Sequence, residues 1–188
     1  MAITVTRPAD HVRMPWANGR GSTLELARRE EADGQLIYRL SVADVVEAGP
    51  FSRLPGIDRH LMLIEGDGFD LMLDGKSSAV LPLMPVAFSG DAAVEAVDIR
   101  GPSRDFNVMT ARGIAAATVS VHHGGVRHQC ADTTFGYVVS GAFSCKGVVV
   151  GEAGLVVAEG EGMIDISGDG CLVLVDIRMP PKPADVLV

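Results

Sequence analysis

The sequence lacks a long uninterrupted apolar run, although 47% of its 188 residues are hydrophobic. A membrane-spanning helix needs roughly 18 such residues in succession. The longest apolar stretch, from Tyr137 to Val157, is broken by Lys146, Glu152 and several glycines. Charged residues also occupy the N-terminal positions where a secretory signal peptide has its apolar segment. We therefore expect a cytoplasmic protein with no membrane association.

The sequence also contains few basic residues and few cysteines. The chain has 16 Lys and Arg residues against 24 Asp and Glu residues, for a net charge of -8, whereas a polyanion-binding surface needs concentrated positive charge. The three cysteines, Cys130, Cys145 and Cys171, form neither a CxxC metal pattern nor an even disulfide framework. We expect no nucleic-acid partner, and we interpret the cysteines as reduced packing residues.

Helical periodicity is nearly absent. The best helix candidate on propensity is segment 23–31, TLELARREE, but Leu24 and Leu26 share one face of a strand, and the preceding glycine-rich turn favours a strand. Elsewhere, short β-prone runs such as HLMLIEG, FGYVVSG and CLVLVDI recur between Gly, Pro, Asp and Ser turn signals. Many short strands of this kind predict an all-β sandwich or barrel.

The spacing of these runs indicates an internal repeat. In each half a strand ends at a glycine, Gly66 or Gly141, and a later apolar strand closes on Ser-Gly-Asp, at 89–91 or 167–169. Two copies of one supersecondary unit are the economical explanation. We therefore predict an N-terminal barrel over 1–115, with a glycine-rich loop at its opening, and a C-terminal barrel over 116–188, packed as one compact unit.

Four segments, in order along the chain, resemble the HutD/Ves family. They are MPWANGRGSTLELA (14–27), GPFSRLPGIDRHLMLIEGDG (49–68), PVAFSGD (85–91) and DFNVMTARG (105–113). The chain differs from the family pattern at Ala17, Arg20 and Ala111, where Lys, Gly and a basic residue are typical. The resemblance implies a double-stranded β-helix fold with two cupin-like barrels, a bicupin of the RmlC-like cupin superfamily.

The resemblance implies a binding role rather than a known reaction. The family is associated with histidine-utilisation genes and stress responses, and no enzymatic reaction is established for it. The expected ligand is therefore a small metabolite, such as a carboxylate or formylated intermediate of histidine breakdown, bound in a regulatory or protective role. Because a fold by itself proves no function, individual residues must supply the argument.

Arg59 is the first candidate for a ligand contact. It lies at the head of the strand-like run HLMLIEG. A guanidinium in that position can hold a carboxylate through two parallel hydrogen bonds. A structural ion pair with Asp58 or Asp105 is the alternative, and the sequence does not decide between them.

The run DFNVMTARG offers a second set of candidates. Because side chains alternate along a strand, Asp105 and Asn107 share a face with Met109, opposite Phe106. If the Phe106 face packs in the core, the two polar side chains face a cavity or solvent. Buried polar groups must then find hydrogen-bond partners, in a ligand or in the other barrel. Arg112, at the strand end, is either a ligand contact or a solvated side chain.

The N-terminal motif completes the predicted binding site. Asn18 begins an Asn-Gly turn, while Trp16 offers an aromatic wall, Thr23 a hydroxyl and Glu25 a carboxylate. This loop either covers a pocket or is a turn anchored by a packed tryptophan. We expect Phe88 to form a second apolar wall.

A metal centre lacks its usual sequence pattern. Cupin enzymes typically bind metal through His-x-His, a downstream Glu and a later His, whereas the first half offers only His60 and Glu65. In the second half, His122, His123 and His128 crowd the segment HHGGVRH, where adjacent histidines point to opposite strand faces. We interpret this segment as a flexible, solvent-exposed loop, with a metal site as the alternative.

Familiar catalytic motifs are missing as well, since the sequence has neither a G-x-S-x-G nucleophile elbow nor a P-loop. We expect no catalytic residue, no metal ligand and no cofactor. The expected partner is a small-molecule ligand, and a homodimer is possible. The alternative function is a cupin-type enzyme acting on a small polar substrate, either metal-dependent or using Glu25, Asp91 and Asp105 as acid and base. A third alternative is a structural module that works through protein contacts.

Overall fold

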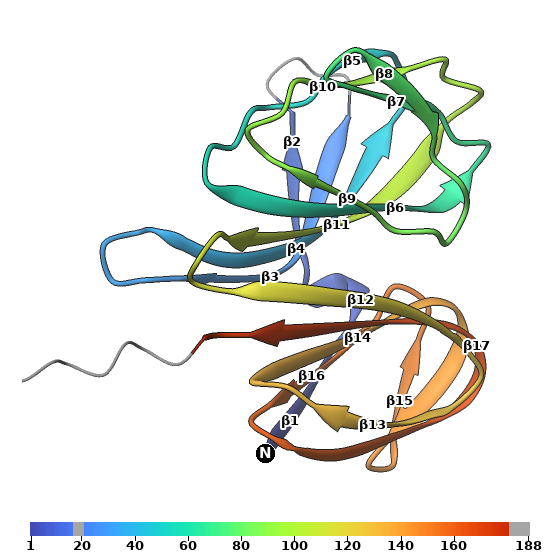
Figure 1. Ribbon diagram of the computed structural model, residues 1–188. Helices are drawn as coiled ribbons and strands as arrows, with labels where there is room; N and C mark the ends of the chain where they lie inside the picture. The colour runs from blue at the N-terminus through green and yellow to red at the C-terminus, as the bar shows by residue number, and fades with distance from the viewer. Residues whose placement is uncertain (17–20, 181–188) are drawn as a thin grey trace, which may run out of the picture.

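Two β-barrels are stacked on each other in the computed structural model, which describes residues 1–16 and 21–180 (Figure 1). In these residues the only helical element is a single 3-10 turn, η1 (Pro8–Asp10). No helix in the described part of the chain is long and apolar enough to cross a membrane. The predicted all-β bicupin architecture is confirmed.

The N-terminal barrel is built from two antiparallel sheets. The larger sheet has the order β2 (Val12–Pro15), β3 (Ser22–Glu30), β4 (Leu36–Val45), β11 (Ser103–Ala111), β6 (Ile57–Gly66) and β9 (Val86–Ser89). The smaller sheet has the order β5 (Gly49–Pro50), β10 (Val94–Val97), β7 (Asp70–Leu73) and β8 (Lys76–Ala79). The segment after the glycine-rich turn is thus strand β3, as predicted, with Leu24 and Leu26 both buried.

The C-terminal barrel is one antiparallel sheet that curls on itself. Its main path has the order β1 (Ala2–Thr6), β16 (Leu155–Glu159), β14 (Thr133–Cys145), β17 (Gly162–Arg178) and β12 (Ala116–His123). Strand β13 (Val126–Cys130) pairs with β17, and β15 (Val148–Gly151) pairs with β14. The first strand of the chain therefore completes the C-terminal sheet, whereas the expected division at residue 115 counted it with the N-terminal barrel.

The two barrels share a hydrophobic core at their interface. Phe106 and Val108 of β11 lie in this core, and Phe106 packs against Tyr137 of β14 with ring centroids 5.2 Å apart. A second aromatic pair, Tyr38 and Phe135, meets edge to face at 5.5 Å. One face of β11 is thereby committed to the interface, so its other face is turned into the N-terminal barrel.

The interior of the C-terminal barrel is filled by apolar side chains, among them Phe143 and Ile166. Cys130 and Cys145 belong to this core, and all three cysteines are buried and free of disulfides. Burial raises the pKa of each of the three thiols and so disfavours the reactive thiolate. This agrees with their predicted role as packing residues.

Candidate functional site

A cavity of about 220 Å³ lies in the N-terminal barrel, on the face of β11 that points away from the barrel interface. Five of the nine predicted ligand contacts line it: Trp16, Thr23, Arg59, Asp105 and Asn107. They come from the segment after β2 and from strands β3, β6 and β11. Residues distant in the sequence are therefore gathered around one space.

Strand pairing explains why these side chains converge. In the register of β11 with β6, Met109 lies opposite Arg59, and Asn107 and Asp105 lie two and four residues along the strand. Cross-strand partners project to the same face of a sheet, so Arg59 shares the inner face with both polar residues. A β-bulge between Arg104 and Asp105 shifts the register where β11 reaches the cavity; such bulges re-aim side chains at binding sites.

Arg59 is a buried cation in contact with two aromatic rings. Its side chain is 6% exposed, and its guanidinium carbon lies 5.5 Å from the ring centre of Phe51 and 5.0 Å from that of Phe88. One guanidinium nitrogen donates a weak hydrogen bond of 3.4 Å to Asn107 Oδ1, but Nε has no partner. Burial lowers the pKa of Arg59, and the nearby Asp105 opposes that shift.

The structure does not show the alternative structural ion pair of Arg59 with Asp58 or Asp105. Among the described residues, none of the carboxylates lies within 4.0 Å of its guanidinium, because Asp58 pairs with Arg112 at 2.7 Å and Asp105 is held by Asn107. Arg59 is therefore not part of a closed ion pair. A desolvated cation with an open hydrogen-bonding position is a strong attractor for an anion.

Asp105 is the other unusual group in the cavity wall, with only 1% of the residue exposed. Its Oδ2 accepts a 2.8 Å hydrogen bond from Asn107 Nδ2, whereas its Oδ1 has no partner. Burial raises the pKa of Asp105 to about 6, against the opposing effects of the Asn107 hydrogen bond and of Arg59. Strongly perturbed carboxyls of this kind cluster at functional sites.

Two unsatisfied atoms in one cavity wall point to a missing partner. A buried polar group without a hydrogen bond costs about 1 to 3 kcal/mol, and native proteins contain few of them. Of the four such side-chain atoms in the described residues, Arg59 Nε and Asp105 Oδ1 both belong to this cavity. One is a donor and the other a carboxyl oxygen, so the cavity wall offers two open hydrogen-bonding positions.

At the side of β3 the cavity wall is made by Trp16 and Arg39. The indole Nε1 of Trp16 donates a 2.8 Å hydrogen bond to Thr23 Oγ1, which fixes the ring against the strand. A Cβ on Gly21 would come within 3.0 Å of that ring, so glycine makes this close packing possible. Glu25 is not a lining residue; its carboxylate instead accepts a 2.7 Å bond from Arg39, which does line the cavity.

The remaining predicted contacts lie elsewhere. Phe88 does not line the cavity but supports it by stacking on Arg59. Arg112 is on the exposed surface, where it binds Asp58 at 2.7 Å and Asp91 at 2.8 Å, and it is not among the lining residues. Asn18 falls outside the described residues, as do the family departures at positions 17 and 20.

Sequence reasoning missed Arg39 and Ser41 of β4, which line the cavity beside β11. In the register of β4 with β11, Arg39 faces Met109 and Ser41 faces Asn107. The signal was present in the sequence, because these residues alternate with the buried Leu40 in the run YRLSVAD. A polar residue on the inner face of a barrel strand is itself a pointer to a cavity.

The histidine-rich segment of the second half is not the exposed loop that we predicted. His122 and His123 are the last two residues of β12 and His128 lies within β13, so only the turn between these strands is a loop. His128 Nε2 contacts Asp176 at 2.9 Å, and Thr134 donates a 2.6 Å hydrogen bond to the same carboxylate. In the described part of the chain, no group of three or more His, Cys, Asp or Glu side chains is arranged to hold a metal ion.

A family model described as HutD matches residues 8–172. A Pseudomonas putida protein described as an uncharacterized 21.2 kDa protein in the hutC 3′ region is 41% identical over 112 residues, which are 58% of each chain. Protein Ves from Citrobacter koseri is 35% identical over 141 residues, 68% of each chain. The chain thus spans between about half and two thirds of the length of these relatives.

The solved structure of HutD from Pseudomonas fluorescens SBW25, obtained in a formate condition, is similar over nearly the whole molecule. The TM-score is 0.86 at 36% identity, with 95% of this chain and 99% of that chain covered. A nickel(II) complex of a bacterial pirin from Escherichia coli shares the fold alone, with a TM-score of 0.66 at 11% identity over 96% of this chain and 100% of that one.

Proposed function

Because this chain belongs to the HutD family, we propose that it binds a small carboxylate metabolite in the cavity of its N-terminal barrel. The observation that carries the proposal is the buried guanidinium of Arg59, which has an unpartnered Nε and no carboxylate of the described chain within ion-pairing distance. A ligand carboxylate supplies both the missing charge and the missing hydrogen-bond acceptor.

The surroundings of Arg59 favour recognition by geometry as well as charge. The planar guanidinium contacts the rings of both Phe51 and Phe88, which reduces the conformational entropy that the side chain loses on binding. Cation–π contacts also compensate part of the desolvation cost of the buried charge. A cavity of about 220 Å³ suits a ligand of metabolite size rather than a polymer.

The proposed ligand is a carboxylate or formylated intermediate of histidine breakdown, bound in a regulatory or protective role. Two observations support this choice: the chain's family membership, and its similarity to a Pseudomonas putida protein whose description places it in the hutC 3′ region. The chemistry of Arg59 itself specifies only the carboxylate.

The test is a thermal-shift titration of the full chain with formate, acetate, succinate and glutarate. We expect at least one of these probes to raise the melting temperature of the wild-type protein in a saturable manner, and R59A to lose that shift. R59K keeps the positive charge but loses the planar fork, so we expect weakened binding. R100A removes an exposed arginine that pairs with Asp70 on the same barrel and should leave the shift unchanged. A wild-type shift that persists in R59A contradicts the proposal.

A second candidate function is an acid–base enzyme acting on a small polar substrate. The pKa of Asp105, raised to about 6 in the cavity wall, favours it, because a carboxyl that titrates near neutral pH can exchange a proton with a bound molecule. Proton NMR of each probe incubated with the protein separates the two candidates. Unchanged probe spectra together with saturable binding support the binding protein, and a new product supports the enzyme.

A further inference from the structure

The two unsatisfied atoms of the cavity belong to side chains that a single amide connects. Asn107 donates through Nδ2 to Asp105 Oδ2 at 2.8 Å and accepts through Oδ1 from Arg59 at 3.4 Å. Asp105 and Arg59 are therefore linked through Asn107 on one wall, and each keeps one unpartnered atom, Oδ1 and Nε respectively. A carboxylate that binds Arg59 comes close to the carboxyl group of Asp105.

Two ionised carboxylates in one desolvated space repel each other, and one of them responds by taking up a proton. The protonated group then donates a short hydrogen bond to the other, which replaces repulsion by attraction. At Asp105 only Oδ1 is available for this proton, because Oδ2 already accepts from Asn107.

We infer that Asp105 takes up one proton from water when a carboxylate binds Arg59, and that its Oδ1–H then donates a hydrogen bond to the bound carboxylate. This inference rests on the proposed function and specifies how the site recognises its ligand. Arg59 Nε donates to the same carboxylate, so both unsatisfied atoms gain a partner. No covalent bond of the ligand forms or breaks, and the only species exchanged is the proton that solvent supplies to Asp105.

In the free protein, the pKa of Asp105 already lies close to neutral pH. Burial raises the pKa of Asp105 to about 6, so one proton is added at modest cost near neutral pH. An ordinary exposed aspartate has a pKa near 3.9. Protonating it at pH 7 would reduce the free energy of carboxylate binding by the equivalent of about three pKa units. The depth of Asp105 in the barrel therefore suits the role of a proton-carrying contact.

The charged residues around Asp105 either shift its pKa or are paired with another residue. On β4, the side of Asp105 opposite Arg59, Asp44 raises the pKa of Asp105 slightly, while Arg39 is paired with Glu25 of β3 at 2.7 Å. Arg59 on β6 lowers the pKa of Asp105 but leaves it well above the ordinary value. Among the described residues that line the cavity, Asp105 thus carries a carboxyl group with no cation in direct contact.

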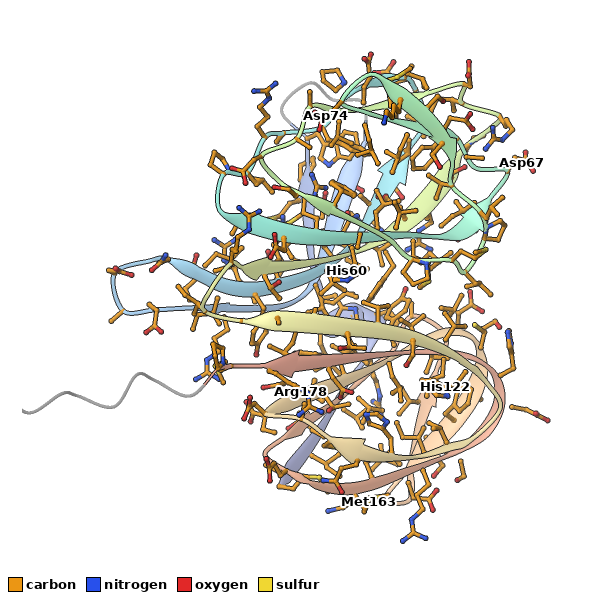
Figure 2. All side chains as sticks on the ribbon, viewed as in Figure 1. His60, Asp67, Asp74, His122, Met163 and Arg178 are labelled. Carbon is orange, nitrogen blue, oxygen red and sulfur yellow. The ribbon has the colours of Figure 1, made fainter. Side chains whose placement is uncertain are left out.

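His60 is the nearest alternative proton acceptor in the sequence, but it faces the opposite way. It is paired with Val108, whose side chain lies in the core between the barrels. Figure 2 places His60 at the junction of the two barrels, and His60 is not among the residues that line the cavity. H60Q therefore serves as a matched control in which a neighbouring titratable group is removed and Asp105 is kept.

The experiment is isothermal titration calorimetry of the full chain with acetate and with glutarate at pH 7, in two buffers with different heats of protonation. We expect uptake of close to one proton per bound carboxylate. We also expect the wild-type Kd to rise about tenfold per pH unit above pH 6.5, as one linked proton requires. H60Q should keep both properties.

D105N places an amide where the protonated carboxyl would be, so it is expected to bind without proton uptake. Its Kd should be flat from pH 6.5 to 8.5 and lower than that of the wild type at pH 8 by about tenfold or more. Carboxylate binding by the wild type without proton uptake overturns this inference and leaves the proposed function standing. Failure of all four probes to bind overturns the proposed function itself. The wild-type measurement in two buffers decides the matter even if D105N does not fold.

Discussion

At the scale of single residues, two side chains of the cavity wall leave hydrogen-bonding atoms unpartnered, at a cost in folding stability. Asp105 Oδ1 and Arg59 Nε are buried without partners in the free protein, a condition that most folded proteins avoid because each such atom opposes folding. The surrounding barrel must compensate for both. The stability of the free protein should therefore depend on the charge of Asp105.

We predict that D105N stabilises the free protein at pH 7.5 but not at pH 4. The folded-state pKa of about 6 lies above the usual value of 3.8, so the native state retains its proton while the unfolded chain loses it, and wild-type stability falls as pH rises from about 4 to 6. Above pH 6 the full penalty remains, on the order of 2 to 3 kcal/mol. Urea unfolding at the two pH values measures it.

D91N is the matched control for that measurement. Asp91 is an exposed carboxylate whose pKa is lowered by hydrogen bonds from Arg112 and Ser89, so its neutralisation should not stabilise the protein at pH 7.5. If D105N and D91N change stability alike, the unpaired charge of Asp105 is not the cause.

At the scale of elements, strand β11 joins the proposed binding site to the packing of the two barrels. Phe106 and Val108 lie in the core between the barrels, while Asp105 and Asn107 line the cavity from the opposite face. A shift of this strand by one residue would exchange the two faces. The hydrophobic pairing across the interface therefore also fixes the register of the polar wall.

F106A should destabilise the protein by about 3 to 5 kcal/mol, because it removes a ring with only 1% exposure from the shared core. V12A, on an exposed position of β2, should stay within about 0.5 kcal/mol of the wild type. Chemical denaturation of both variants provides the comparison. A small effect of F106A would mean that the barrels do not depend on their shared core.

Alternation was sufficient to predict the polar face of β11 because the strand is continuous over nine residues. The same rule applied to β4 would have found Arg39 and Ser41, but no recognisable motif drew attention to them. The segment around His122 and His128 was misjudged because its glycines suggested a loop. Both flanking strands instead continue up to a short turn and pair with β17, a long-range contact that local sequence does not report.

At the scale of the whole molecule, the first and last described strands, β1 and β17, belong to the same C-terminal barrel. Strand β1 pairs with β16 over all five of its residues, and Ile3 and Val5 pack against the C-terminal core. The short run AITVT resembles many other strands, so its partner was not predictable from the sequence. The overall division into two barrels was predictable because it repeats a recognisable supersecondary unit.

Replacing Ile3 and Val5 together by serine should loosen the C-terminal barrel, since both side chains contribute to its core from the edge of the sheet. Hydrogen exchange should accelerate in Leu155–Glu159 of β16, with little change in β4 and β11 of the N-terminal barrel. The paired substitution of Ala2 and Thr4 by serine, on the exposed face of the same strand, controls for general effects. Equal exchange in the two double variants contradicts the predicted role of β1.

The pairing of β1 with β16 also constrains the order of events during synthesis. The ribosome synthesises β1 before the N-terminal barrel and its partner β16 after that barrel, so β1 has no partner while the N-terminal barrel, Val12 to Ala111, emerges and becomes able to fold. The C-terminal barrel can be completed only after β16 and β17 have left the ribosome. We therefore expect the nascent protein to expose an unpaired AITVT strand until β16 emerges.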